Sequence, residues 1–188
     1  GEEHVSIASL GKEIYNQTIV INGVSKSYAM TGWRIGYTAG PLNVIKAMSS
    51  LQSQVASGSN SIAQYAAEEA LRSPKGAAEI ERMRKAYDER RQHIVARLNA
   101  IDGLKCVMPK GAFYVMVDMS ALIGKHLGDC EITGSMDFAS ILLENADVAL
   151  TPGSAFCAEG FCRISYATSM ENIDKGVDRI ERFVKNLV

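Results

Sequence analysis

The sequence predicts a protein that mixes helices and strands, with an α/β arrangement in its first part and an α+β arrangement in its second. A β-branched run over 18–24, followed by a second short apolar stretch over 33–38, is typical of strands. Residues 77–101 are expected to form a long amphipathic helix, because apolar residues recur there at helical spacing. Beyond that helix, short strand patterns alternate with helical ones, which predicts helices packed on one face of a small sheet.

The first part of the chain contains short elements separated by glycine, proline and serine. The two strands are too little sheet for a self-sufficient domain, so we expect residues 1–75 to be the end of a larger one. Ser73-Pro74-Lys75-Gly76 is the best boundary signal, which predicts a second domain over 76–188. The expected elements are a short or broken helix over 6–17, strands over 18–24 and 33–38, a helix from Gly40-Pro41 to about Val55, a break over 57–61 and a helix over 62–71.

The second part is expected to be complete in itself as an α+β unit. Glycine and proline again divide it, at Asp102-Gly103 and at Pro109-Lys110-Gly111. The expected elements are the helix over 77–101, strands over 104–108 and 112–118, an irregular stretch over 120–134, a helix over 135–145, a strand over 148–150, a loop over 151–154, a strand over 161–167 and a closing helix over 170–187.

Composition excludes several classes of function. The formal net charge of the 188 residues is −1, which argues against a general binder of nucleic acid or acidic membranes. No apolar run approaches a membrane span, and the N-terminal residues lack the pattern of a signal peptide, so a cytoplasmic protein is expected. The four cysteines form no CxxC pair and the histidines are scattered, which predicts no metal site and free, buried thiols in a reducing compartment.

The stretch NGVSKSYAMTGWRIGY, residues 22–37, contains the most informative chemistry. Lys26 lies among small residues after an apolar strand, and Arg34 follows eight positions later. An uncharged lysine amine can form a Schiff base with an aldehyde. An arginine guanidinium offers a planar fork of donors that fits a phosphate. Together they predict an aldehyde that carries a phosphate, and pyridoxal phosphate is the obvious molecule of that kind.

At this point the residues resemble a known family, the class I aminotransferases among the fold-type I pyridoxal-phosphate enzymes, which include aspartate aminotransferases. The resemblance covers essentially the whole chain in the family's order, and the spaced pattern is more specific than a glycine-serine-lysine alone. The segments that carry it are GVSK with Lys26, AM at 29–30, GWRIG at 32–36, KGAFY at 110–114, PGSAF at 152–156 and FCRISYA at 161–167.

The resemblance implies a role for four residues. Lys26 would hold pyridoxal phosphate as an internal aldimine and then move a proton between the substrate and the cofactor. Arg34 would bind the cofactor phosphate, with a hydrogen bond from Ser25. Arg163 would bind the substrate α-carboxylate. The implied reaction is transamination between an amino acid, by default aspartate or an aromatic one, and a 2-oxo acid, in a cytoplasmic homodimer.

The resemblance also implies what these residues do not supply. Other ring-binding groups of the family precede the lysine, where this sequence has 25 residues, so the chain is expected to be the C-terminal part of the large domain plus the small domain, inactive alone. Ser57, Ser59 and Asn60 lie where family members send a loop across the dimer, although helix capping explains them equally. The alternatives are a carbon–sulfur lyase of the same fold, an aminotransferase-like domain of a transcription regulator, or a packing and dimerisation module.

Overall fold

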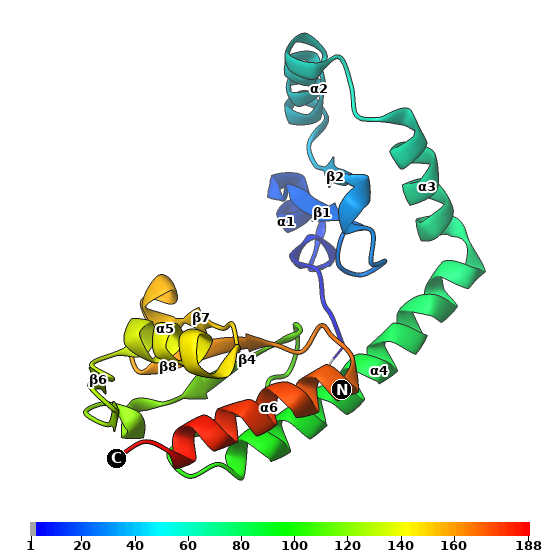
Figure 1. The fold of residues 1–188 in the computed structure, drawn as a ribbon. Coiled ribbons are helices and arrows are strands. Elements are labelled where there is room, and N and C mark those ends of the chain that lie inside the picture. The colour runs from blue at the N-terminus through cyan, green and yellow to red at the C-terminus, as the bar shows by residue number, and fades with distance from the viewer. Residues whose placement is uncertain (1–2) are drawn as a thin grey trace. The chain divides into compact units, whose positions relative to one another are not determined.

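The computed structural model describes residues 3–188 (Figure 1). The chain divides into two compact units, one that ends at Arg84 and one that begins at Lys85. The division falls inside the long helix α4 (Pro74–Asn99). This helix begins with a proline, which the first turn accepts because an N–H group there has no hydrogen-bond partner within the helix. The domain boundary predicted between 75 and 76 therefore lies in the first turn of this helix. The observed division between the two units lies further along the same helix.

The first unit contains one hairpin and a series of helices. The hairpin pairs β1 with β2 antiparallel, from Val20 opposite Ala39 to Gly23 opposite Gly36. Asn60 caps helix α3, because its Oδ1 accepts a hydrogen bond of 3.0 Å from the Ala63 backbone N–H. The elements are η1 (Ile7–Ser9), α1 (Lys12–Gln17), β1 (Val20–Gly23), η2 (Thr31–Trp33), β2 (Gly36–Ala39), α2 (Leu42–Ala56) and α3 (Ser61–Arg72).

Few side chains are buried in the first unit. Val24 is fully buried, whereas helix α2 buries none of its residues, and the strand residue Ile21 is 78% exposed. Most apolar surface of the hairpin and of α2 is therefore in contact with solvent in this chain. This agrees with the expectation that the first part lacks the material for a core of its own.

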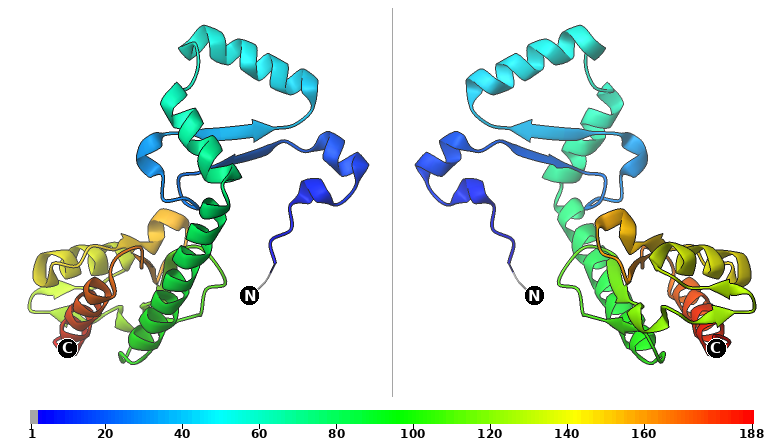
Figure 2. Two further views of the ribbon diagram at one scale, coloured as in Figure 1. Left: turned by 90° about the vertical axis from the view of Figure 1, so that its right-hand side faces the viewer. Right: turned by 90° about the vertical axis from the view of Figure 1, so that its left-hand side faces the viewer.

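The second unit is an antiparallel sheet in the order β3-β4-β8-β7, accompanied by a small separate hairpin, β5-β6. Helices α5 and α6 and the C-terminal part of α4 lie along this sheet, as Figure 2 also shows. The elements after α4 are β3 (Lys105–Cys106), β4 (Tyr114–Asp118), η3 (Ser120–Leu122), β5 (His126–Leu127), β6 (Cys130–Glu131), α5 (Ser135–Ala146), β7 (Thr151–Pro152), η4 (Gly153–Phe156), β8 (Phe161–Ser165) and α6 (Met170–Lys185).

One core joins these elements. Along β4 and β8 the side chains alternate, so that Val115, Val117 and Cys162 are buried while their neighbours lie on the other face. The helices cover the buried face with apolar residues at helical spacing. Those of the three helices are Ile94, Val95, Leu98, Phe138, Ile141, Leu142, Ile173, Val177, Ile180 and Phe183. The opposite face of the strands is left for other contacts.

Most expected elements are present, and three expectations are corrected. The second strand begins at Gly36 rather than at residue 33, because Arg34 adopts a left-handed conformation that no strand accommodates. Residues 148–150 form no strand; Val148 and Leu150 pack against the core, and the paired strand is β7. The stretch 120–134, expected to be irregular, contains η3 and the β5-β6 hairpin.

The cysteines correct a further expectation. Cys106 and Cys162 are buried, but Cys130 and Cys157 are exposed. Burial raises the pKa of the Cys106 thiol to about 11. Burial, followed by the nearby charge of Glu159, raises the pKa of the Cys162 thiol to about 12. Only two of the four thiols therefore behave as the buried small apolar side chains that the sequence predicts.

No helix within residues 3–188 combines the length and the apolar character that crossing a bilayer requires.

Candidate functional site

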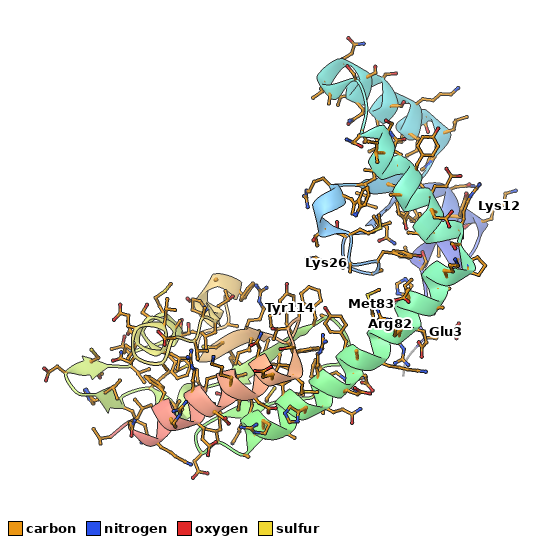
Figure 3. All side chains as sticks on the ribbon, turned by 45° about the vertical axis from the view of Figure 1, so that its right-hand side comes forward. Glu3, Lys12, Lys26, Arg82, Met83 and Tyr114 are labelled. Carbon is orange, nitrogen blue, oxygen red and sulfur yellow. The ribbon has the colours of Figure 1, made fainter. Side chains whose placement is uncertain are left out.

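The loop between β1 and β2 carries Lys26 and Arg34. It leaves the hairpin at Gly23 and returns at Gly36, and these two residues face each other in the register. The loop turns at once, since the backbone N–H of Tyr28 donates to the carbonyl of Val24 and that of Ala29 to the carbonyl of Lys26, both at 3.2 Å. Figure 3 shows Lys26 on this turn. One short segment thus presents an amine and a guanidinium from the end of a single hairpin.

The two glycines let the ends of this loop approach closely. A Cβ added at Gly36 would lie 3.1 Å from the carbonyl oxygen of Asn22, and one at Gly23 would lie 3.3 Å from that of Ile35. Both distances are shorter than ordinary van der Waals contact between these atoms. Side chains at these two positions would force the strand ends apart. The glycines that the sequence places before Lys26 and after Arg34 are therefore explained by the closure of the loop.

The same loop contains two residues with backbone conformations that side chains usually avoid. Ala29 has φ +54° and Arg34 has φ +50° with ψ +48°, both in the left-handed region. For a non-glycine residue this conformation costs on the order of 1–3 kcal/mol and is concentrated at ligand sites. Arg34 Nη1 donates to the carbonyl of Thr31 at 3.1 Å, which ties the side chain to the loop. The left-handed backbone conformation and this hydrogen bond together restrict the direction of the Arg34 side chain.

The loop fits a phosphorylated aldehyde by the chemistry of its donors. The Lys26 amine and the Arg34 guanidinium are both solvent-exposed, and the half-buried Ser25 supplies a hydroxyl next to the lysine. An amine bonds to an aldehyde, and a guanidinium with a hydroxyl binds a phosphate. The predicted cofactor residues Ser25, Lys26 and Arg34 are thus brought together on one loop.

Arg163 lies in the second unit, on β8, opposite Met116 of β4 on one side and Thr151 of β7 on the other. It points to the face of the sheet that the core helices leave uncovered, since its neighbour Cys162 is buried in the core. Its guanidinium carbon lies 4.3 Å from the ring centroid of Tyr114 and 4.4 Å from that of Phe156. Two aromatic rings therefore hold the guanidinium in place.

The guanidinium of Arg163 is half-buried, yet it makes no side-chain hydrogen bond or ion pair with any residue from 3 to 188. An arginine has five N–H donors in a fixed fork, and a partly buried one usually has an acceptor. Ring contacts satisfy none of these donors. The arrangement is therefore suited to a planar acceptor such as a carboxylate, which takes two parallel hydrogen bonds from the fork.

Sequence reasoning missed the two rings that hold Arg163. Both lie in segments that carry the family resemblance, Tyr114 in KGAFY and Phe156 in PGSAF, but neither was predicted to contact Arg163. Tyr114 was within reach of a sequence argument, because it alternates with the buried Val115 and must therefore lie on the open face of β4. Phe156 was not, since it comes from η4, whose position follows only from the packing of the fold.

The segment over 57–60 has a structural role and lines a cavity. Asn60 is the cap of α3, and Ser57 adopts φ +58° at the end of α2. Within the first unit, a cavity of about 620 Å³ opens beside them. Its lining is rich in hydroxyl and amide groups, from Ser49, Gln52, Ser53, Ser57, Ser59 and Gln64. The capping alternative is thus confirmed for Asn60, and the role of Ser57 and Ser59 in a dimer stays a prediction.

Comparison with known proteins identifies relatives along nearly the whole chain. The family model of aminotransferases of class I and II matches residues 1–180. The chain is 49% identical over 185 residues to an aspartate aminotransferase of Bacillus sp. (strain YM-2), covering 98% of this chain and 46% of that protein. It is 44% identical over 182 residues to an aspartate/prephenate aminotransferase of Nitrosomonas europaea, covering 96% and 45%.

Solved structures agree with the sequence relatives. An aspartate aminotransferase structure from Rhizobium meliloti matches with a TM-score of 0.94 and 43% identity, over 100% of this chain and 47% of that one. An aromatic aminotransferase structure from Pyrococcus horikoshii matches with a TM-score of 0.86 and 40% identity, over 98% and 47%. The chain therefore spans about half the length of the relatives that it matches.

Proposed function

Because the chain belongs to the class I and II aminotransferases, we propose that it supplies the cofactor lysine and the substrate arginine of an enzyme that moves an amino group from an amino acid to a 2-oxo acid. The observation that carries the proposal is the loop between β1 and β2, which presents the amine of Lys26 and the guanidinium of Arg34 together. Aspartate is the first candidate substrate and an aromatic amino acid the second, because relatives at 40–49% identity carry these names.

Lys26 is the residue that would bond to the aldehyde of pyridoxal phosphate. When bound, this cofactor withdraws electrons from the Cα of the amino acid and so makes its proton acidic. The Lys26 Nζ would be the base that removes this proton and the acid that returns it. A positioned acid–base group of this kind contributes about 10²- to 10⁴-fold in rate.

Arg34 and Ser25 would hold the phosphate. The Arg34 guanidinium keeps one Nη on the carbonyl of Thr31, which leaves its other donors for phosphate oxygens. Its left-handed backbone and this hydrogen bond set the side chain in advance, so that less freedom is lost on binding. Ser25 adds a hydroxyl from the residue that precedes the lysine.

Arg163 would bind the α-carboxylate of the substrate. Its N–H fork has no acceptor among residues 3–188, and its ring contacts restrict its rotation. A carboxylate held at two points has a fixed orientation, which in turn orients the Cα–H bond that must break. Removing the fork is therefore expected to raise KM for both the amino acid and the 2-oxo acid, since both carry the same carboxylate.

We also propose that the domains divide at 75/76, that the enzyme is a homodimer and that it is located in the cytoplasm. The 188 residues alone are expected to lack transaminase activity, because relatives about twice as long carry it and the loop offers no group for the cofactor ring. A carbon–sulfur lyase of the same fold is the alternative. It shares the expected roles of Lys26, Arg34 and Arg163 and differs in its products.

The test compares variants of a form of the protein as long as its relatives, not of this shorter chain alone. Lys26→Ala is expected to lower kcat for aspartate and 2-oxoglutarate by at least about 10²-fold. Arg163→Lys keeps the charge but loses the two-point fork, and is expected to raise KM for both substrates with a smaller change in kcat. Glutamate and oxaloacetate as sole products support the transaminase. Ammonia and a thiol from a cysteine-derived substrate would favour the lyase, and full activity of Lys26→Ala would refute both.

A further inference from the structure

Ser135 has the only buried aliphatic hydroxyl among residues 3–188. It is the first residue of helix α5 and is fully buried, 19 residues before its hydrogen-bond partner Ser154 in the chain. A buried hydroxyl is costly unless it is hydrogen-bonded. Its partners therefore show why the fold retains it.

Ser135 joins a backbone amide and a carboxylate, the first through its hydroxyl and the second through its own backbone N–H. The backbone N–H of Ser154 donates to Ser135 Oγ at 3.1 Å, and the backbone N–H of Ser135 donates to Glu159 Oε1 at 2.5 Å. The Glu159 carboxylate accepts a further backbone N–H, from Gly160, at 3.2 Å. These hydrogen bonds lower the pKa of Glu159, most of all the one from the Ser135 amide.

Two glycines make room for this group of contacts. A Cβ at Gly134 would lie 3.0 Å from the Glu159 Oε1 atom. A Cβ at Gly153 would lie 2.0 Å from the carbonyl oxygen of Ala158 and 2.4 Å from that of Phe161. The segment over 153–160 is thus folded tightly on itself, and its one side-chain attachment to α5 runs through Ser135 and Glu159.

This segment carries Phe156, one of the two rings on Arg163. Phe156 follows Ser154 by two residues within η4 and is itself 43% exposed, so apolar burial alone fixes it weakly. η4 follows strand β7 directly, and the hydrogen bond from the Ser154 N–H to the buried hydroxyl attaches it to helix α5 as well. The position of the ring, and through it the orientation of the Arg163 guanidinium, therefore depends on that attachment.

We propose that Ser135 and Glu159 are positioning residues, which hold η4 on helix α5 so that Phe156 orients the guanidinium of Arg163 for a carboxylate ligand. The proposal deepens the proposed function and rests on it for the identity of the ligand. Neither residue touches the ligand in this account. Their effect is on the geometry of Arg163, and it is expected in carboxylate affinity and not in the rate of proton transfer.

The first test measures the geometry and needs no activity. In the 188-residue chain, the Arg163 Nε–H resonance in a ¹H–¹⁵N spectrum senses the ring currents of Phe156 and Tyr114. Ser135→Ala and Glu159→Ala, which remove the two acceptors, are expected to shift this resonance toward its position in a Phe156→Leu variant. Ser135→Thr keeps the hydroxyl and is expected to retain the wild-type shift. Ser140→Ala and Glu144→Ala, at exposed positions on α5, are the matched controls.

The second test measures the ligand in the protein at the length of its relatives. Ser135→Ala and Glu159→Ala are expected to raise KM and the inhibition constant of an unreactive dicarboxylate, maleate, about two- to fivefold, with kcat unchanged. An unchanged Nε–H resonance in both variants overturns the positioning role. A shifted resonance with unchanged maleate affinity overturns the claim that this positioning serves carboxylate binding. Unchanged maleate affinity in Arg163→Lys refutes Arg163 as the carboxylate site, so that the two proposals fail separately. Thermal unfolding of each variant identifies any loss through misfolding. If Ser135→Ala does not fold, the comparison of Glu159→Ala with Glu144→Ala decides the result.

Discussion

Replacing Gly153 by alanine adds one methyl group at the most crowded glycine of the second unit. The added Cβ would lie 2.0 Å from the carbonyl oxygen of Ala158 and 2.4 Å from that of Phe161. Ordinary contact between a methyl carbon and an oxygen requires about 3.4 Å or more. Both obstacles are backbone atoms, and one belongs to a residue at the start of β8, so no side-chain rotation relieves the overlap.

The size of the effect follows from what must move. The segment over 153–160 has to shift by more than 1 Å, which breaks the 2.9 Å hydrogen bond from the Ala158 N–H to the Gly153 carbonyl. Overpacking of this kind costs about 1–3 kcal/mol, and the lost hydrogen bond about 1 kcal/mol more. A total of about 3 kcal/mol would lower the Tm of a unit of this size by roughly 12–24 °C.

Thermal unfolding of the 188-residue chain, followed by circular dichroism, measures this shift. Gly111→Ala is the matched control, because a Cβ there meets nothing within 4 Å. That variant is expected to be neutral or up to about 1 kcal/mol more stable, since alanine restricts the unfolded chain. A Gly153→Ala variant whose Tm lies within a few degrees of the control would show that the tight fold over 153–160 is wrong, and with it the basis for placing Phe156 on Arg163.

Two further predictions concern thiol reactivity and acid stability. Exposed Cys130 and Cys157 are expected to react with an alkylating reagent at pH 8 well before buried Cys106 and Cys162, whose thiolates are suppressed; peptide mass spectrometry measures the order, and early labelling of Cys162 would contradict it. A hydrogen bond from His93, with smaller effects of Arg97, lowers the pKa of Asp174 in the folded state. The ionised carboxylate therefore stabilises the fold above the unfolded-state pKa of about 4. This stability is lost as the pH falls through the lower pKa of the folded state. Asp174→Asn is therefore expected to flatten the dependence of unfolding free energy on pH below about 4, and an unchanged acid slope in urea unfolding would contradict this.

The sequence predicts the helices of this chain better than its strands. Helix α6 is a clear case, because Ser169 caps its start and apolar residues recur along one face to Phe183. Strand β7 shows the reverse. Its two residues, Thr151 and Pro152, pair with β8, whereas the more apolar residues before it, Val148 and Leu150, pack against the core without a ladder partner. Pairing is a property of the neighbouring strand, which local composition does not specify.

The candidate site divides in the same way. The placement of Lys26 and Arg34 on one loop was predictable, because a single hairpin connection holds both and their spacing in the sequence is preserved in the fold. Arg163 could be placed on its strand, but its ring partners come from β4 and η4, which meet only through the sheet. Ser135 gave no signal at all, since a serine at the start of a helix is ordinarily a cap. Its burial and its bond to Ser154 follow from tertiary packing alone.

The central claim is that Lys26 is the lysine to which pyridoxal phosphate attaches. The most direct measurement incubates the protein at the length of its relatives with pyridoxal phosphate, reduces it with borohydride, and maps the phosphopyridoxyl mass on every lysine peptide. The account predicts one dominant label, at Lys26, that is lost in Lys26→Ala and weakened when Arg34 is replaced by alanine. Labelling spread over surface lysines such as Lys46 at the same level as at Lys26 would contradict it.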